Sequence, residues 1–449
     1  MRLYRFRSDN ENTIDELNKN YFYFALPKEL NDPMEGFIKL YWEGDYVLWR
    51  NFLKHYLYTF TNTLLNIYIS PETIKDPLPI HFDETMLPSK EFIEIFEEIR
   101  DTFFDNKEII SFINYLTKLK HRIYIKELKQ YLGFIQIITL SIIVNVLKKH
   151  SILDWTVVPV KKLDVFKQLE LVMPAAETQY PQYIKYFFDA FDKVRNEMNL
   201  SFKITFKDKD KNGLKHFFIN EFSNKYIDEV KSLALATPCV VSFMEDYSSP
   251  AFWGYYGNNH KGICLIFDDN EKSNEIRFDF KTTWGGIATL TQTVKYKTEF
   301  EDVNFFKMLG SLSLYAIDKF WLTDWDGNKT EYLKIGENYL TDDWRKEYNT
   351  TLFNSFTVKL PDWEKEKEHR LVIEKEMFAN DSIDSRKFVY DFNLLKGVIF
   401  GFRTDDEFKI KVIDIIKSKC KTIGRNDFHF YQAGYNEKTG FIQMGEIQI

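Results

Sequence analysis

The stretch LYRFR at Leu3–Arg7 opens the chain and sets the fold expected of it. Within it, apolar and basic residues alternate, which is typical of a strand that buries one face. The residues TIDE at Thr13–Glu16 fit a capping box, in which the first and last side chains satisfy free amides at the start of a helix. An aromatic strand at Tyr21–Phe24 and a loop at Pro27–Pro33 follow. The chain is therefore expected to begin as strand, short helix, strand and turn.

The pattern changes in the middle of the chain and then returns. Apolar residues recur at spacings of three and four along Trp49–Leu64, which is the period of an amphipathic helix. Further helical patterns lie at 90–104, 107–119, 122–149, 182–198 and 215–235, and two more at 300–320 and 404–418. Strand patterns lie at 239–244, 262–267, 292–296, 369–375, 396–401 and 420–424. Strands at both ends of a helical middle predict an α+β fold with a mixed or antiparallel β core, split by a large all-helical insertion. We expect a core domain of residues 1–40 and 236–449 and an insertion domain of residues 41–235.

Composition narrows the function classes. The 449 residues carry a net charge of −7, which argues against a general polyanion binder and hence against nucleic acid as a partner. Three scattered cysteines without a C-x-x-C pair suit a reducing compartment, without disulfides or structural zinc. The first residues lack the apolar core of a signal peptide. The apolar stretch Tyr131–Leu147 is shorter than the about 20 residues of a membrane span and predicts a buried helix. These features predict a cytoplasmic protein with no membrane association.

Two segments outside the helical block carry chemistry. In Phe252–Leu265, Trp253, Tyr255, His260 and a lysine lie close together before a predicted strand, and aromatic faces beside a cation can hold a planar ring. The plainer alternative is a loop that packs its aromatic residues on the sheet. The second segment, KLPDWEKEKEHRLVIE at Lys359–Glu374, runs into an apolar strand.

Three charged residues of that second segment share a strand face if the extended conformation begins early. Glu366, Glu368 and Arg370 are spaced by two, the period of a strand. Paired carboxylates beside a cleft suit the stabilisation of a developing oxocarbenium ion and the activation of an attacking group. The alternative is a solvated turn of alternating charge. The chain has no phosphate-binding glycine loop, no G-x-S-x-G and no H-E-x-x-H, which disfavours the enzyme classes that carry those motifs.

Taken in order, the motifs resemble a bacterial domain-of-unknown-function family, number twenty-nine seventy-one in its series. The matching segments are Leu3–Phe6, Leu30–Glu35 (LNDPME), Ser242–Met244 (SFM), Phe252–Gly262 (FWGYYGNNHKG), Trp363–Arg370 (WEKEKEHR) and Ile399–Gly401 (IFG). The resemblance covers residues 1–40 and about 237–432. Met244 and Phe252 depart from the family pattern, which has Ser and Met there. The family name itself carries no activity.

A second resemblance suggests a reaction. The order of Arg5 or Arg7 on an early strand, Ser242 on a middle strand and Glu366-Lys367-Glu368 before a late strand is similar to the R-S-E arrangement of ADP-ribosyltransferases. The resemblance implies NAD as substrate, with a glutamate on the ribose 2′-hydroxyl that stabilises the cation formed when nicotinamide leaves. It also implies an arginine on the pyrophosphate and an aromatic ring on the nicotinamide.

The expected site combines these segments. The predicted catalytic residues are Glu368, Glu366 and His260. The predicted ligand-binding residues are Arg5, Arg7, Tyr23, Asn31, Asp32, Ser242, Trp253, Tyr255 and Arg370. No bound metal ion is expected.

Three functions stay open at this point. The first is an NAD-consuming ADP-ribosyltransferase or glycohydrolase effector, of the toxin or phage-defence kind. The second is a non-catalytic sensor or binding module that recognises a protein partner through residues 41–235. The third is a metal-dependent nuclease built from Asp32, Glu35, Glu366 and Glu368. An enzyme site requires the first strand and the acidic pair at Glu366 and Glu368 to meet in one cleft.

Overall fold

The computed structural model divides into two compact units. It describes the chain apart from residues 70–77, 81–88, 156, 158–167, 170–172, 174–175, 177–180, 206–210, 235, 269–274, 283–284 and 376–381. The sheet unit consists of Met1–Phe37, Ala236–Phe300 and Asn349–Ile449, and the helical unit consists of Ile38–Leu235 and Glu301–Tyr348.

The sheet unit is built on an eight-stranded sheet in the order β17-β16-β15-β6-β1-β5-β13-β9. Its strands are β1 (Arg2–Arg7), β5 (Pro238–Met244), β6 (Ile263–Asp268), β9 (Gln292–Thr293), β13 (Glu368–Glu374), β15 (Leu395–Phe400), β16 (His429–Tyr435) and β17 (Ile442–Glu446). All neighbours are antiparallel except β15 and β16, which are parallel. The predicted α+β class with a mixed sheet is confirmed.

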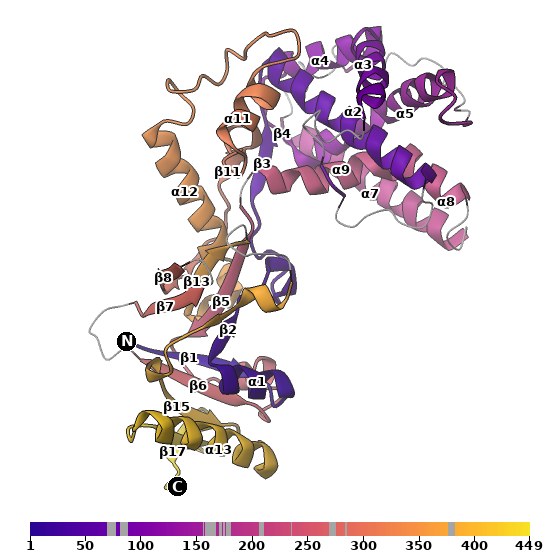
Figure 1. Ribbon diagram of the computed structural model, residues 1–449. Coiled ribbons are helices and arrows are strands. Elements are labelled where there is room, and N and C mark those ends of the chain that lie inside the picture. The colour runs from indigo at the N-terminus through magenta and orange to yellow at the C-terminus, as the bar shows by residue number, and fades with distance from the viewer. Residues whose placement is uncertain are drawn as a thin grey trace. The chain divides into compact units, whose positions relative to one another are not determined.

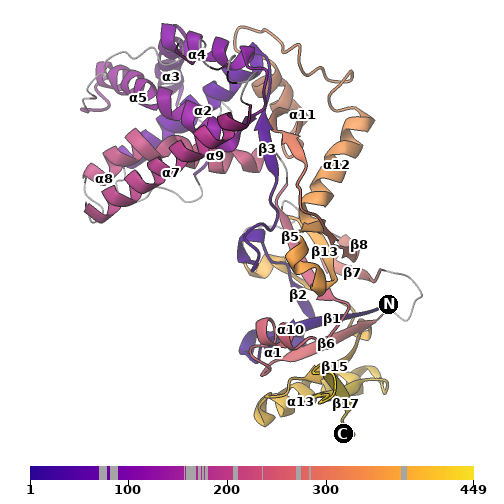
Figure 2. The same ribbon diagram turned by 180° about the vertical axis from the view of Figure 1, so that it is seen from behind.

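Helices cover both faces of this sheet (Figures 1 and 2). On one face, α1 (Glu11–Lys19) and α13 (Asp406–Ile423) bury Leu17, Val412 and Ile416 against the strands. On the other face, the short helix α10 (Pro250–Tyr255) buries an aromatic pair against β1. The strand expected at 420–424 was wrong, because α13 continues to Ile423 and ends at Gly424 in the left-handed conformation. A five-residue segment is too short for its periodicity to separate a strand from the last turn of a helix.

The pairing between strands is reduced to one residue pair between β1 and β5. Six residue pairs join β1 to β6 and seven join β5 to β13, whereas only Tyr4 and Met244 pair β1 with β5. The two strands therefore diverge, and the side chains beyond this pair face an opening within the sheet unit.

Smaller elements complete the sheet unit. Two-stranded pairs are formed by β2 (Tyr21–Tyr23) with β14 (Lys387–Val389), β7 (Arg277–Thr282) with β8 (Gly285–Leu290), and β10 (Lys295–Tyr296) with β12 (Val358–Lys359). The predicted strand at 292–296 is thus two short strands, β9 and β10. A 3-10 helix at Pro27–Glu29 follows β2, and another at Pro361–Glu366 precedes β13.

The helical unit has its own aromatic core. Its helices are α2 (Tyr46–Ile69), α3 (Lys90–Phe104), α4 (Lys107–Lys118), α5 (Ile125–Lys149), α7 (Pro181–Thr205), α8 (Lys211–His216), α9 (Phe222–Val230) and α11 (Leu314–Ala316), and α12 (Asp342–Thr357) crosses the boundary to the sheet unit. It also holds a small sheet of β3 (Lys39–Trp42), β4 (Ile123–Tyr124) and β11 (Asp302–Asn304).

The segment Glu301–Tyr348, expected in the core domain, belongs to the helical unit. The reason is packing: β11 pairs with β3, the Phe305 ring stacks on Trp42, and Trp321 lies 4.4 Å from the His55 ring. Among the described residues, α5 is the one helix long and apolar enough to cross a membrane. Most of its apolar window is buried inside the unit, as the sequence led us to expect for Tyr131–Leu147.

A close backbone approach at Gly262 gives a stability prediction. A Cβ at this position would lie 2.0 Å from the Arg7 carbonyl oxygen. This clash is with backbone rather than with a flexible side chain, so relieving it would require one of the two backbone segments to shift. We expect Gly262→Ala to lower the free energy of unfolding by about 3 kcal/mol, as overpacking does, measured by urea denaturation. Gly254→Ala is the control, because nothing lies within 4 Å of its Cβ. Equal stability of the two variants would contradict the expectation.

Candidate functional site

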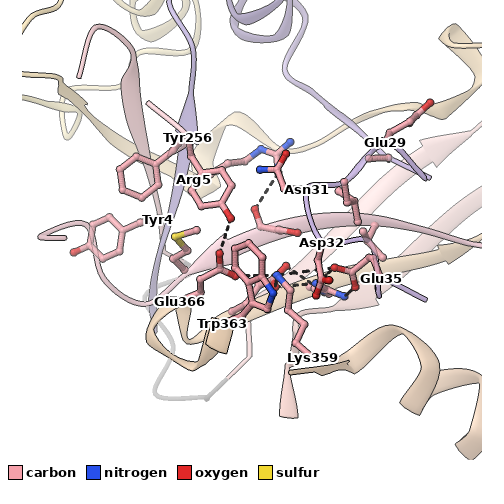
Figure 3. Close-up of a pocket in the computed structure, with 18 of the residues that line it drawn as sticks. Tyr4, Arg5, Glu29, Asn31, Asp32, Glu35, Tyr256, Lys359, Trp363 and Glu366 are labelled. Atoms are coloured by element: carbon pink, nitrogen blue, oxygen red, sulfur yellow. Dashed lines mark hydrogen bonds and ion pairs between the residues drawn. The ribbon is translucent and has the colours of Figure 1, made fainter. Parts of the chain in front are cut away.

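A cavity of about 360 Å³ opens in the sheet unit where β1 and β5 diverge (Figure 3). Residues far apart in the sequence line it, from β1, β2, the loop at 29–35, β5, the turn after α10 and the segment 359–370. Its aromatic lining is Tyr4, Phe6, Tyr23, Tyr256 and Trp363. Its charged lining is Arg5, Arg7, Glu29, Asp32, Glu35, Lys359, Glu366, Glu368 and Arg370. The loop at Asn31–Pro33 and the acidic pair at Glu366 and Glu368 thus meet in one cavity.

Five of these side chains, Glu35, Lys359, Glu366, Glu368 and Arg370, form what we call the ionic cluster. Lys359 Nζ lies 2.9 Å from both Glu366 Oε2 and Glu368 Oε2. Arg370 donates Nε to Glu368 Oε1 at 2.7 Å and Nη2 to Glu35 Oε2 at 2.9 Å. Three carboxylates face two cations, so the formal charge of the cluster is −1.

The local backbone explains why both glutamates reach one lysine. The 3-10 helix Pro361–Glu366 ends at Lys367, whose φ is 43°. This left-handed residue turns the chain into β13, which begins at Glu368. The extended conformation therefore begins later than the shared-face argument assumed, and Glu366 is brought beside Glu368 by the turn. Arg370 and Glu368 do share a face of β13.

Glu368 is buried and stays ionised. Burial alone would raise its pKa, but the charges of Arg370 and Lys359 and hydrogen bonds from Arg370 and Ser242 lower the pKa to about 2. Ser242 pairs with Arg370 across β5 and β13, which places it on the same side. For Lys359, burial would lower the pKa, and the charges of Glu368 and Glu366 raise it above its ordinary value. Burial is also the main reason why the pKa of Glu35 is raised.

A second charged group lies on the β1 side. Arg5 donates Nη1 to the Ser242 carbonyl at 3.0 Å, and its guanidinium lies over the Phe22 and Phe243 rings. Glu16 of α1 pairs with both Arg5 and Arg7. Burial, with the nearby charge of Arg7, lowers the pKa of Arg5 to about 10, so the guanidinium remains protonated at neutral pH.

Tyrosine and tryptophan side chains connect the cavity wall to the charges. The Tyr256 hydroxyl donates to Glu366 Oε1 at 2.5 Å. The Trp363 ring centroid lies 4.9 Å from Lys359 Nζ, a cation–π contact. On the opposite side, the Tyr23 hydroxyl donates to Glu29, which also pairs with Arg386.

Most of the predicted site residues line the cavity. These are Arg5, Arg7, Tyr23, Asn31, Asp32, Ser242, Glu366, Glu368 and Arg370. Glu35 and Lys359 also line the cavity. They were not among the predicted catalytic or ligand-binding residues, although they lie in the motifs at Leu30–Glu35 and Lys359–Glu374. Tyr256 was not among them either, because only the helical conformation of α10 shows which of two adjacent tyrosines faces inward.

Trp253, Tyr255 and His260 do not line the cavity, and their predicted roles are corrected here. Trp253 is buried against Phe6 on the sheet, and its indole N–H donates to the Tyr247 carbonyl. Tyr255 is 78% exposed and is not among the residues that line the cavity. His260 ends a run of three left-handed residues, with φ of 45°, 52° and 69° at Asn258, Asn259 and His260. Its carbonyl accepts the Arg403 N–H, so its role in the described structure is in the turn.

The carboxylates of the ionic cluster are hydrogen-bonded to Lys359 and Arg370 and do not converge on a shared vacant position. Asp32 is used locally, because its Oδ1 accepts the Met34 N–H. Within the described part of the chain, no group of three or more His, Cys, Asp or Glu side chains is placed to hold a metal ion. The arrangement suits electrostatic stabilisation of a cation within the cavity.

The comparisons with known proteins agree with one of the two resemblances. A family model described as "Protein of unknown function (DUF2971)" matches residues 252–371, which include Tyr256 and the segment Lys359–Arg370. The family resemblance predicted from the sequence is confirmed over these residues. The comparisons give no support to the resemblance to ADP-ribosyltransferases. Neither the curated proteins nor the solved structures contain a match to the chain.

The lowered pKa of Glu368 predicts a pH-dependent contribution to stability. A carboxylate whose pKa falls from 4.5 to about 2 on folding stabilises the fold above pH 4.5 and loses that contribution as the pH falls toward 2. We expect Glu368→Gln to lower the free energy of unfolding by about 3 kcal/mol at pH 7. The gap from the native protein should narrow steadily between pH 5 and pH 3 in urea titrations.

The control for this experiment is Glu364→Gln, a substitution of an exposed glutamate in the same segment. Its stability should follow the native protein at every pH. A gap for Glu368→Gln that is the same at pH 7 and pH 3 would show that the carboxylate is not held ionised by its neighbours.

Proposed function

We propose that the cavity is the active site of an enzyme that cleaves the bond between nicotinamide and ribose in NAD, and transfers the ADP-ribosyl group to water or another acceptor. One observation supports this most. Arg5, Ser242 and Glu368 come from the three adjacent strands β1, β5 and β13 and line one cavity. Their order along the chain is similar to that of the R-S-E arrangement.

The charge of the ionic cluster suits this bond cleavage. Nicotinamide carries a positive charge while bound to ribose and leaves as a neutral molecule, so the departing ring needs no proton donor. Positive charge instead builds on the ribose carbon, where a fixed anion lowers the barrier. Glu368 is an enclosed, ionised carboxylate held by Arg370, Lys359 and Ser242, and it supplies the fixed anion beside which the ribose cation would form.

The other cavity walls suit the remaining parts of the ligand. Arg7, which pairs with Glu16 and is about a quarter exposed, offers a guanidinium group, and such groups bind phosphate oxygens two at a time. The buried Arg5 holds the Ser242 carbonyl and adds positive charge behind it. Tyr23, Tyr256 and Trp363 offer ring faces for a planar base. The volume of about 360 Å³ is at the lower end of ligand pockets and suits the reacting nicotinamide and ribose, with the adenosine half outside. An enzyme of this kind would deplete cytoplasmic NAD, the basis for a toxin or phage-defence role.

A different observation favours a binding module as the second candidate. Helix α7 of the helical unit exposes several large apolar side chains, among them Tyr186, Met198 and Ile204, each about two-thirds exposed. Apolar surface of this kind is typical of protein interaction sites. A partner that requires α7 and still binds the Glu368→Gln variant, in a protein that does not turn over NAD, would favour this function.

The proposed reaction predicts a large effect of one carboxylate. With NAD as substrate, we expect the native protein to release nicotinamide and Glu368→Gln to do so about 10² to 10⁴ times more slowly, since loss of the anion raises the barrier by about 3–5 kcal/mol. Chromatographic measurement of nicotinamide gives both rates. Glu35 and Glu366 still balance Lys359 and Arg370 in this variant, so the fold should persist, which circular dichroism checks.

Glu364→Gln serves as the matched control, because this exposed side chain does not line the cavity. It should keep the native rate. Absence of nicotinamide release from the native protein, or an unchanged rate in Glu368→Gln, would overturn the proposal.

A further inference from the structure

Glu366 lines the cavity, but its neighbours cover most of its carboxylate. Its side chain is only 4% exposed, and each carboxylate oxygen already has a partner. Oε2 accepts from Lys359 Nζ at 2.9 Å, and Oε1 accepts from the Tyr256 hydroxyl at 2.5 Å. The phenol of the half-buried Tyr256 thus covers Oε1 of the buried Glu366 at the cavity wall (Figure 3).

Tyr256 is held firmly at that place. It follows α10, whose Trp253 is fully buried, and its own N–H donates to the Phe252 carbonyl at 2.8 Å. The turn that follows is closed by the Gly262 N–H, which donates to the Gly257 carbonyl at 2.8 Å. Burial, and then the hydrogen bond to Glu366 and the charge of that carboxylate, raise the pKa of Tyr256, so the phenol keeps its proton at neutral pH. The phenol thus donates to Glu366, and its oxygen accepts from the Asn31 side chain and keeps a lone pair for a second donor.

We propose that Tyr256 is a catalytic residue that relays a proton from the attacking O–H group to Glu366, an inference that rests on the proposed function. The attacking group is water in the simplest case. Its oxygen bonds to the ribose carbon as the bond from that carbon to nicotinamide breaks, and the electron pair leaves with the nicotinamide nitrogen. The proton of the attacking oxygen passes to Tyr256 Oη, while the phenolic proton passes to Glu366 Oε1. No oxidant or reductant takes part.

This relay gives the two glutamates different tasks. Glu368 stays ionised beside the ribose cation, since Arg370 and Lys359 both hold it. Glu366 gains a proton during the reaction, and Lys359 fixes its orientation so that Oε1 faces the phenol. Tyr256 and Glu366 then act as a unit, and removing either should have the same consequence as removing both.

The test compares Tyr256→Phe, Glu366→Gln and the double variant, with NAD as the probe and nicotinamide release as the readout. Phenylalanine keeps the ring and removes only the relaying oxygen. We expect each single variant to lower kcat about 10²-fold, the contribution of a positioned proton-transfer group, with KM changed by less than about 3-fold. The double variant should be no slower than the slower single variant, within about 3-fold.

Tyr255→Phe is the matched control, because this neighbouring tyrosine is exposed and lies outside the cavity. It should keep the native kcat. If Tyr256→Phe does not fold, Glu366→Asp replaces it, because the shorter side chain keeps the charge and withdraws the carboxylate from the phenol. The same loss of kcat is expected.

The outcomes separate the two proposals. A native protein that releases no nicotinamide would end the proposed function and the relay with it. Release at the native rate by Tyr256→Phe, or a double variant whose loss is the product of the single losses, would end the relay and leave the proposed function standing.

Discussion

The buried guanidinium of Arg370 is the group on which the cavity depends. It binds Glu368 on its own strand, Glu35 from the loop after β2, and the carbonyl of Phe356 at the end of α12. Two enclosed carboxylates without this cation would be expensive to keep ionised. Arg370 therefore joins three segments that lie up to 335 residues apart. Together with Lys359 it leaves the ionic cluster with one excess negative charge.

The sheet supplies the space that this charge needs. A continuous ladder between β1 and β5 would pair backbone groups and close the opening, whereas a single pair at Tyr4 and Met244 lets the strands separate. Arg5 then takes the Ser242 carbonyl that an unbroken ladder would have used. Strands β5 and β13 keep Val241, Phe243, Leu371 and Ile373 on the core with α1 and α13, whereas β1 places Tyr4 and Phe6 on the opposite face. The same alternation that builds the core thus aims Ser242, Glu368 and Arg370 at the cavity.

Periodicity alone predicted much of this arrangement. The strands at both ends of the chain, the helices between them and the charged motif before β13 all follow from local pattern, because strand and helix periods are local properties. The partner of Lys359 and the inward-facing tyrosine do not follow from pattern. The first depends on the left-handed conformation of Lys367, which brings Glu366 beside Glu368. The second depends on α10, which ends immediately before Tyr256. Glu301–Tyr348 belongs to the helical unit because its aromatic residues pack there, as Phe305 does on Trp42. Such long-range packing cannot be read from the local sequence pattern.

The run of left-handed residues at Asn258, Asn259 and His260 has a consequence for how relatives of this chain can diverge. Side chains branched at Cβ are strongly disfavoured in this conformation, whereas asparagine, aspartate, glycine and histidine tolerate it. Substitutions at these three positions should therefore be limited to a few residue types, even where the side chain contacts no ligand. An alignment of relatives would then show an apparently invariant histidine whose persistence reflects backbone geometry, and such a column would be easy to mistake for chemistry.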